Sequence, residues 1–168
     1  MPAALDFDYA QQIIFWSDTG YETISGLRLG GGGPGGPGPG PCPGEPGSPE
    51  PHHQTFDVIT ENIESPEGLA VDWLTHKLYW ADSEANRIEV ARYDGSLRSL
   101  LFWTDLEQPR ALVLVPPEAL LFWCSWGPGQ ARIERASMDG DPASRRVIRA
   151  SRDLLYPNGL TVDYEARR

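Results

Sequence analysis

A short motif built around tryptophan recurs along the chain, and its spacing constrains the fold more than any other feature of the sequence. The fullest copy runs from Gly68 to Asp82 and contains Gly-Leu-Ala-Val-Asp-Trp, then Leu-Tyr-Trp-Ala-Asp. Weaker copies span residues 4–18 and 111–125, and a further copy begins at Gly159 with Gly-Leu-Thr-Val-Asp-Tyr.

The interval inside the motif is fixed. In every complete copy the tryptophan lies eight positions after the residue that ends the first apolar run, which gives the pairs Asp8/Trp16, Asp72/Trp80 and Val115/Trp123. The motif tryptophans Trp80 and Trp123 are 43 residues apart. A repeat of this length predicts an array of like units, each unable to bury its apolar face alone.

Each repeat contains short apolar or alternating runs separated by turn residues, which is the pattern of β-strands. In the second repeat these runs are 68–72, 77–81, 87–92 and 98–103, with the hairpin signal Asp94-Gly95 between the last two. The third repeat copies this order with a run at 132–136 before Asp139-Gly140. Four short strands around a fixed tryptophan predict a propeller blade. An ordinary sandwich also offers many short strands, but it gives no reason for the motif to recur in register.

These repeats resemble the class B (Tyr-Trp-Thr-Asp) repeats of the low-density lipoprotein receptor family, in which six blades close into a ring. The resemblance extends in particular to the first propeller of the Wnt co-receptors among the low-density lipoprotein receptor-related proteins. The segments that carry it are Asp82–Val90, Asp94–Arg98, Leu101–Trp103, Gln108–Ala111, Arg132–Gly140 and Tyr156–Leu160.

The resemblance is dense from about Ser65 onward and thinner over Ala4 to Leu29. It implies an all-β fold: a partial six-bladed-type β-propeller with about three four-stranded blades plus one strand. Residues 1–29 would form the N-terminal part of the first blade, and residues 30–53 a disordered insert rich in glycine and proline. Residues 54–168 would form the remainder of the first blade, two further blades and the start of a fourth.

The insert has almost no apolar side chains, so burial cannot offset its ordering entropy, and we expect it to be disordered. Trp16 and Trp80 are 64 residues apart, so removal of about twenty residues restores the period. A tolerated or artefactual insertion is favoured over a polyproline ligand, because glycine interrupts nearly every proline. Cys42 lies in the insert, and Cys124 follows Trp123 in a strand. A buried thiol is favoured for Cys124 over a Cys42–Cys124 disulfide.

The formal net charge is −10, with 24 acidic and 14 basic residues. This balance disfavours binding to nucleic acid and favours a basic partner, or simply solubility. No run of apolar residues is long enough to insert this segment in a membrane, and the first residues do not have the pattern of a signal peptide.

We expect no enzymatic activity, no cofactor and no metal site. His52 and His53 fall in the insert and His76 in a turn, and no nucleophile, phosphate-binding or metal-ligand motif occurs. Recurrence of aspartate once per blade favours a structural role, and the resemblance implies that these carboxylates bond backbone groups and tie blades together. The expected structural set is Asp8, Asp18, Asp72, Asp82, Asp163, Trp16, Trp80 and Trp123.

The third repeat has Val115 and Ser125 at two of the aspartate positions. Its contacts with the neighbouring blade should be weaker, by about 1–3 kcal/mol for each charge-assisted hydrogen bond that is lost.

The resemblance also implies a ligand-binding surface where loops gather at one end of the central channel. Asn158 corresponds to the asparagine that pairs with the asparagine side chain of Asn-x-Ile motifs in secreted Wnt antagonists, since two amides can exchange a donor and an acceptor. A turn role for Asn158 in Pro-Asn-Gly remains open. The other matching positions are Arg110, Trp126, Glu84, Glu67, Ser65, Glu22 and Tyr156.

The sequence therefore predicts a non-enzymatic protein-binding module of a Wnt co-receptor-like receptor, at the extracellular face of the plasma membrane. Its expected partners are secreted Wnt proteins or Wnt antagonists with Asn-x-Ile loops. The alternative is a truncated, non-functional or purely structural propeller fragment.

Overall fold

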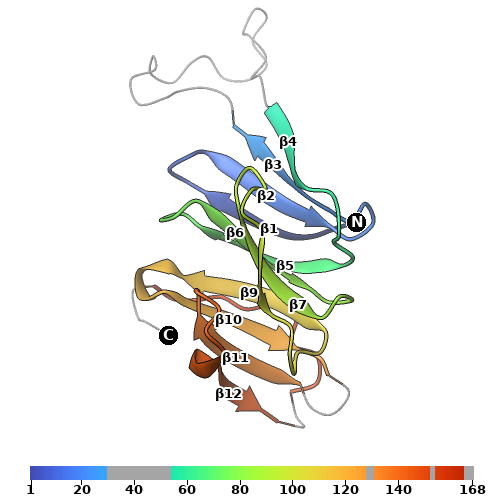
Figure 1. Ribbon diagram of the computed structural model, residues 1–168, viewed down its shortest axis with the longest axis vertical. Coiled ribbons are helices and arrows are strands. Elements are labelled where there is room, and N and C mark those ends of the chain that lie inside the picture. Colours follow the sequence, from blue (N-terminus) through green and yellow to red (C-terminus); the bar gives the residue numbers. More distant parts are fainter. Residues whose placement is uncertain (30–53, 128–130, 152–153, 165–168) are drawn as a thin grey trace, which may run out of the picture.

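The computed structural model describes residues 1–29, 54–127, 131–151 and 154–164, and the expected insert at 30–53, with Cys42, lies outside them. Twelve strands in the described residues form three four-stranded antiparallel sheets that follow one another along the long axis (Figure 1). Blade 1 contains β1 (Pro2–Asp8), β2 (Ile13–Asp18), β3 (Thr23–Arg28) and β4 (Gln54–Ile59). Blade 2 contains β5 (Pro66–Asp72), β6 (Lys77–Asp82), β7 (Arg87–Arg92) and β8 (Ser99–Phe102). Blade 3 contains β9 (Pro109–Val115), β10 (Leu120–Ser125), β11 (Arg132–Ser137) and β12 (Arg146–Ala150).

The prediction of a partial β-propeller is confirmed. The four strands of blade 2 fall within two residues of their expected limits. The motif tryptophan lies in the second strand of each blade, which is β2, β6 or β10. Two single turns of 3₁₀ helix, η1 (Pro116–Glu118) and η2 (Pro142–Ser144), join strands in blade 3. In the parts of the chain that the structure describes, no helix has the length and apolar character to cross a lipid bilayer.

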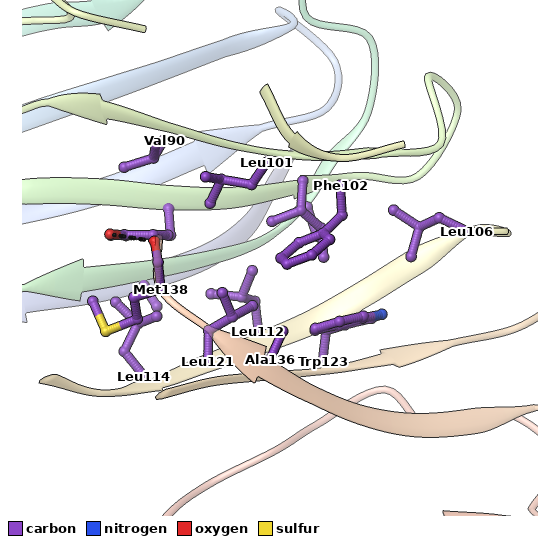
Figure 2. Packing of buried hydrophobic residues seen from close by; sticks show 14 residues of the cluster. Val90, Leu101, Phe102, Leu106, Leu112, Leu114, Leu121, Trp123, Ala136 and Met138 are labelled. Carbon is purple, nitrogen blue, oxygen red and sulfur yellow. Dashed lines mark hydrogen bonds between the residues drawn. The ribbon is translucent and has the colours of Figure 1, made fainter. Parts of the chain in front are cut away.

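Each blade has two faces, because successive side chains of a strand point to opposite sides of a sheet. We call the face that meets the following blade the forward face and the other the backward face. The forward face of blade 1, with Phe15 and Ile24, packs on the backward face of blade 2, where Trp80 is fully buried. The forward face of blade 2 packs on blade 3 in the same way, with Phe102 stacked on Trp123 at 5.4 Å between ring centroids (Figure 2). The recurring tryptophan is thus the anchor of each backward face.

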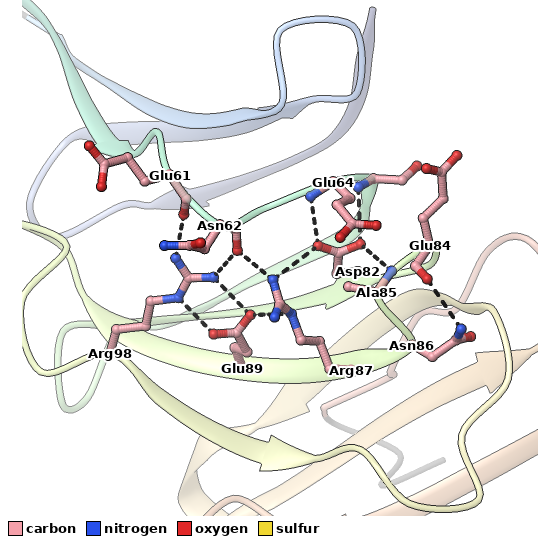
Figure 3. A network of polar contacts seen from close by, with 11 residues as sticks. Glu61, Asn62, Glu64, Asp82, Glu84, Ala85, Asn86, Arg87, Glu89 and Arg98 are labelled. Atoms are coloured by element: carbon pink, nitrogen blue, oxygen red, sulfur yellow. Dashed lines mark hydrogen bonds and ion pairs between the residues drawn. The ribbon is translucent and has the colours of Figure 1, made fainter.

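A buried arginine–glutamate cluster joins blade 2, and a second one joins blade 3, to the segment that precedes it. In blade 2, Glu89 accepts hydrogen bonds from Arg98 at 2.7 and 2.9 Å and forms an ion pair with Arg87 (Figure 3). Arg98 also donates to the carbonyl oxygens of Glu61 and Asn62, which connect blade 1 to blade 2, at 2.6 and 2.5 Å. Its guanidinium carbon lies 5.2 Å from the centroid of the Trp80 ring. We call this arrangement the blade 2 staple.

The blade 3 staple repeats this geometry. Arg145 donates to Glu134 at 2.9 and 3.0 Å and lies over Trp123 at 5.4 Å. It also donates to the carbonyl oxygens of Thr104 and Asp105, at 2.6 and 2.5 Å, in the segment that connects blades 2 and 3. Glu134 is 1% exposed, so its charge is compensated by arginines rather than by water. Sequence reasoning missed both staples.

The recurring aspartates accept hydrogen bonds from different kinds of donor. Asp82 accepts from the amides of Glu64, Ser65 and Ala85 at 2.8, 3.0 and 3.1 Å, which ties the entry of blade 2 to its second turn. Asp8 accepts from the Tyr93 hydroxyl at 2.7 Å and so bridges blades 1 and 2. Asp72 accepts from Leu74 and Thr75, and Asp18 from Gly20 and Tyr21, within their own turns.

Blade 3 lacks the Asp82-type bonds, as expected, and the buried Ser125 hydroxyl has no hydrogen-bond partner among the described residues. The loss is partly replaced from the neighbouring blade. The Asn86 side-chain oxygen accepts from the backbone amide of Gln108 at 2.7 Å, at the entry to blade 3.

The segment after β12 differs from the expectation of a fourth-blade strand. Residues 159–163 belong to no strand. The chain instead runs along the inner strands, which are the first strands of the three blades (β1, β5 and β9), and Tyr164 donates to the Leu114 carbonyl at 2.9 Å. Tyr164 also meets Trp73 edge-on at 5.6 Å. Residues 160–164 and the inner part of blade 3's forward face enclose a cavity of about 420 Å³. Asp163, expected in a structural role, lines this cavity. No strand pairs with the segment, so it lacks the ladder hydrogen bonds of a blade.

Candidate ligand-binding surface

All eight residues predicted to bind ligand lie at one end of the strands. The β2–β3, β6–β7 and β10–β11 turns meet there with the entries of β5 and β9 and with the segment after β12. Strand direction alternates in an antiparallel blade, so every second connection lies at the same end. The turn between the second and third strands therefore lies at the end where the first strand begins and the fourth strand ends. We call this end the ligand end.

Three of the predicted residues occupy one repeated position. Glu67, Arg110 and Asn158 each follow a proline and precede the Gly-Leu or Ala-Leu that opens a repeat. The inner strands approach closely at this point: a Cβ on Gly68 would lie 2.2 Å from the Arg110 carbonyl oxygen. Small residues after the repeated position therefore let neighbouring blades bring these side chains together.

A continuous stack of side chains forms at this place. Glu67 makes an ion pair with Arg110, whose guanidinium carbon lies 3.9 Å from the centroid of the Trp126 ring. Trp126 meets Tyr156 edge-on at 5.3 Å. The stack thus alternates anion, cation and aromatic rings, which is a favourable order for cation–π and aromatic contacts.

The loop that carries Asn158 is anchored to blade 3 through one carbonyl oxygen. The Pro157 carbonyl accepts from the Trp126 indole nitrogen at 2.8 Å and from the Cys124 thiol at 2.8 Å. Burial raises the pKa of the Cys124 thiol to about 11, so the neutral S–H donor persists. Cys124 is free and buried, as expected.

Asn158 itself is exposed, and within the described residues its side chain makes no hydrogen bond. Tyr156 is also exposed, at 72%. The amide donor and acceptor of Asn158 are therefore available beside an aromatic surface that its neighbours hold in place.

The remaining predicted residues lie at the ligand end without joining the stack. Glu22 and Glu84 are exposed in the β2–β3 and β6–β7 turns, with Glu22 in the left-handed region at φ 56°. Ser65 is 9% exposed, and its backbone is held by Asp82 and by Ser83, so it supports the surface more than it contributes to it. The structure therefore joins four of the eight residues, Glu67, Arg110, Trp126 and Tyr156. Asn158 follows Pro157, whose carbonyl oxygen accepts from Trp126.

Sequence reasoning missed the anchoring role of Cys124 and Pro157. A signal for it was present, because Cys124 stands where the motif usually has a threonine, and both side chains can donate to a carbonyl. Among the described residues, no group of three or more His, Cys, Asp or Glu side chains is arranged to hold a metal ion.

The family model described as low-density lipoprotein receptor repeat class B matches residues 76–114 and 119–164, which is half of the chain. The chain belongs to the low-density lipoprotein receptor class B repeat family. It is 39% identical over 125 residues to low-density lipoprotein receptor-related protein 5 of Mus musculus, covering 74% of this chain and 7% of that protein. It is also 39% identical over 111 residues to the vitellogenin receptor Yl of Drosophila melanogaster, covering 66% of this chain and 5% of that protein. The chain thus spans a small part of the curated relatives it matches.

Solved structures support the same fold. One chain in the crystal structure of a nidogen/laminin complex aligns with a TM-score of 0.78 and 32% identity, covering 98% of this chain and 54% of that one. A gluconolactonase of Xanthomonas campestris aligns with a TM-score of 0.62 at 15% identity, covering 89% of this chain and 47% of that one. The second likeness concerns the fold alone.

Proposed function

We propose that this class B repeat unit is a non-enzymatic protein-binding module, of the kind carried by receptors at the outer face of the plasma membrane. The ligand end would bind an extended loop of a secreted protein. The observation that supports this most strongly is the exposed Asn158 amide beside the Arg110–Trp126–Tyr156 stack. Tryptophan, tyrosine and arginine are the side chains that are enriched in protein-binding hot spots.

The finer proposal is that the ligand is an Asn-x-Ile loop of a Wnt antagonist or a Wnt protein, as the family resemblance implies. The ligand asparagine would exchange one donor and one acceptor with Asn158. The isoleucine would lie on the exposed faces of Trp126 and Tyr156. A loop without the amide would be rejected, because it would leave Asn158 covered and unpaired.

Charge sets the approach of the ligand. Glu22 and Glu84 are exposed at the ligand end, and the chain carries a net charge of −10. The two carboxylates would attract a loop flanked by lysine or arginine and speed its association, an effect that salt weakens.

Calorimetric titration tests the proposal with a cyclic peptide that presents Asn-x-Ile between lysines. The intact chain should bind it, and the Ala-x-Ile peptide should bind at least tenfold more weakly, which is about 1.4 kcal/mol. Asn158→Ala should abolish the difference between the two peptides. Glu118→Ala, an exposed change in η1 at the opposite end of the strands, is the control. Equal binding by the wild-type chain and Asn158→Ala would overturn the role of Asn158, and absence of binding to either peptide would overturn the ligand class.

A further inference from the structure

The segment at residues 154–158, which we call the Asn158 segment, is held in a different way from the entries of blades 2 and 3. At the entry of blade 2, Asp82 accepts hydrogen bonds from two backbone amides, and at the entry of blade 3, Asn86 accepts from one. In the Asn158 segment the polarity is reversed, because two side chains of blade 3 donate to the carbonyl oxygen of Pro157.

The two donors come from the same side of one stretch of chain. Cys124 lies in β10 and Trp126 directly follows that strand, and residues two apart in an extended chain point to the same side. The Cys124 thiol and the Trp126 indole nitrogen each lie 2.8 Å from the Pro157 oxygen, which can accept from both because a carbonyl oxygen has two lone pairs. The thiol also lies 3.9 Å from the Ala111 carbonyl oxygen, so Pro157 is its nearer acceptor.

The anchored oxygen belongs to the peptide unit that joins Pro157 to Asn158. Because a peptide unit is planar, a fixed oxygen also constrains the amide nitrogen and the Cα atom of Asn158. The pyrrolidine ring fixes φ of Pro157, which removes a further degree of freedom. The direction of the Asn158 side chain therefore depends on the two donors.

We propose that Cys124 is a positioning residue of the ligand end, which together with Trp126 directs the Asn158 amide and so sets the preference for an asparagine in the ligand. This inference rests on the proposed function of the ligand end. Cys124 is fully buried and cannot touch a ligand, whereas the partly exposed Trp126 can both position the segment and contact one. Variants of Cys124 therefore separate positioning from contact.

The first test compares Cys124→Thr with Cys124→Val by calorimetric titration of the Asn-x-Ile and Ala-x-Ile peptides. The two side chains have the same branched shape, and only threonine keeps a donor for the Pro157 carbonyl. Cys124→Thr should keep the ratio of the two affinities within about twofold of the wild-type value. Cys124→Val should lower that ratio about threefold, through loss of one neutral hydrogen bond.

A merely structural role of Cys124 would weaken the binding of both peptides alike and leave their affinity ratio unchanged. Equal ratios in Cys124→Thr and Cys124→Val would therefore overturn the positioning role.

The second test needs no ligand and follows alkylation of Cys124 by iodoacetamide at about pH 8. Pro157 lies against the sulfur, and burial raises the pKa of the thiol to about 11, so reaction should require the Asn158 segment to move away. A Cys42→Ser background leaves Cys124 as the single thiol. Trp126→Phe keeps an aromatic ring but removes the second donor, and it should speed alkylation about fivefold. Trp103→Phe, at an exposed tryptophan after β8, is the matched control and should leave the rate unchanged.

Ligand binding should also protect a thiol that the ligand does not touch. If the Asn-x-Ile peptide binds only the anchored segment, a peptide concentration of ten times Kd should slow alkylation of Cys124 about tenfold. The Ala-x-Ile peptide at the same concentration should protect less. A bound Asn-x-Ile peptide that leaves the rate unchanged would overturn the coupling between the anchor and the ligand.

The two tests tell failure of this inference from failure of the proposed function. Absence of binding to either peptide would overturn the proposed function and the asparagine preference together, while the alkylation rates still decide whether the anchor holds the segment. Peptide binding with equal alkylation rates in the parent chain and Trp126→Phe would overturn the anchor and leave the proposed function standing.

Discussion

The contact between blades 1 and 2 and the contact between blades 2 and 3 share their outer part and differ near the ligand end and the channel. Both have an arginine–glutamate staple that docks on the preceding connection. In the first, motif aspartates also act, Asp82 on the entry of blade 2 and Asp8 on Tyr93. The second has no such aspartate, and the carboxylate between its blades is Glu67, which pairs with Arg110. In the second contact, Tyr79 donates to the Met138 carbonyl at 3.2 Å and Asn86 caps the Gln108 amide.

The difference shows which parts of the repeat are interchangeable. A backbone amide at a blade entry needs an acceptor, but a carboxylate of its own blade or an amide of the preceding blade can supply it. The staple has no such substitute, because its glutamate is buried between two arginines and its arginine covers the tryptophan anchor. Loss of the motif aspartate therefore weakens a contact without removing it.

Loss of a staple glutamate should have the largest effect. Glu89→Ala and Glu134→Ala should each lower the free energy of unfolding by about 3–5 kcal/mol, because two arginines remain partly buried without their carboxylate. Denaturant titration of each variant measures this, with Glu118→Ala as an exposed control that should change less than about 0.5 kcal/mol. A loss below about 1 kcal/mol for either variant would show that the staple is not the shared element.

Loss of the Asp82 carboxylate should have the next largest effect on the free energy of unfolding. Asp82→Ser gives blade 2 the residue of blade 3 and should cost about 2–3 kcal/mol, since three backbone amides lose a charged acceptor. Ser125→Asp should add little by itself, because Asn86 already caps Gln108. The same aspartate should stabilise by about 1 kcal/mol more in an Asn86→Ala background. Equal effects of Ser125→Asp in both backgrounds would refute replacement by Asn86.

The smallest expected effects come from two tyrosine hydroxyls, Tyr93 in the contact between blades 1 and 2 and Tyr79 in the contact between blades 2 and 3. Burial raises the pKa of Tyr79 to about 12, and burial together with the bond to Asp8 raises the pKa of Tyr93 above its usual value, so both hydroxyls stay donors near neutral pH. Tyr93→Phe should cost about 1.5–3 kcal/mol, because its acceptor is a carboxylate, and Tyr79→Phe about 0.5–1.5 kcal/mol, because its acceptor is a carbonyl. Thermal unfolding of the two variants side by side would contradict this order if Tyr79→Phe proved the more costly.

The sequence predicted the blades well because their signals are local. The Trp80 motif, Asp94-Gly95 and the alternating run at 87–92 each lie within a few residues, so strand limits could be read from them. The staples could not be predicted from local patterns, because Arg98 contacts Glu61 across 37 residues of sequence and Arg145 contacts Thr104 across 41. A glutamate inside a strand also looks like a solvent-facing residue until its arginines are placed.

The candidate site divides in the same way. The resemblance gathered residues from distant loops, and the structure joins Glu67, Arg110, Trp126 and Tyr156. The sequence marked Cys124 as a donor at the threonine position of the motif, but it did not indicate that Cys124 and Trp126 would share the Pro157 carbonyl. It also did not indicate that residues 159–163 would leave the strand pattern. Both features depend on which blade residues the segment after β12 contacts, and local sequence patterns carry no information about such distant contacts.

Amide hydrogen exchange in Glu89→Ala tests most directly whether each blade is held by its neighbour. Glu89 belongs to blade 2, but its arginine docks on the connection from blade 1. Exchange should therefore quicken in the strands of both blades, by the same factor in β2, β3, β6 and β7. Faster exchange confined to β6 and β7, with β2 and β3 unchanged, would show that the blades are independent and contradict this account.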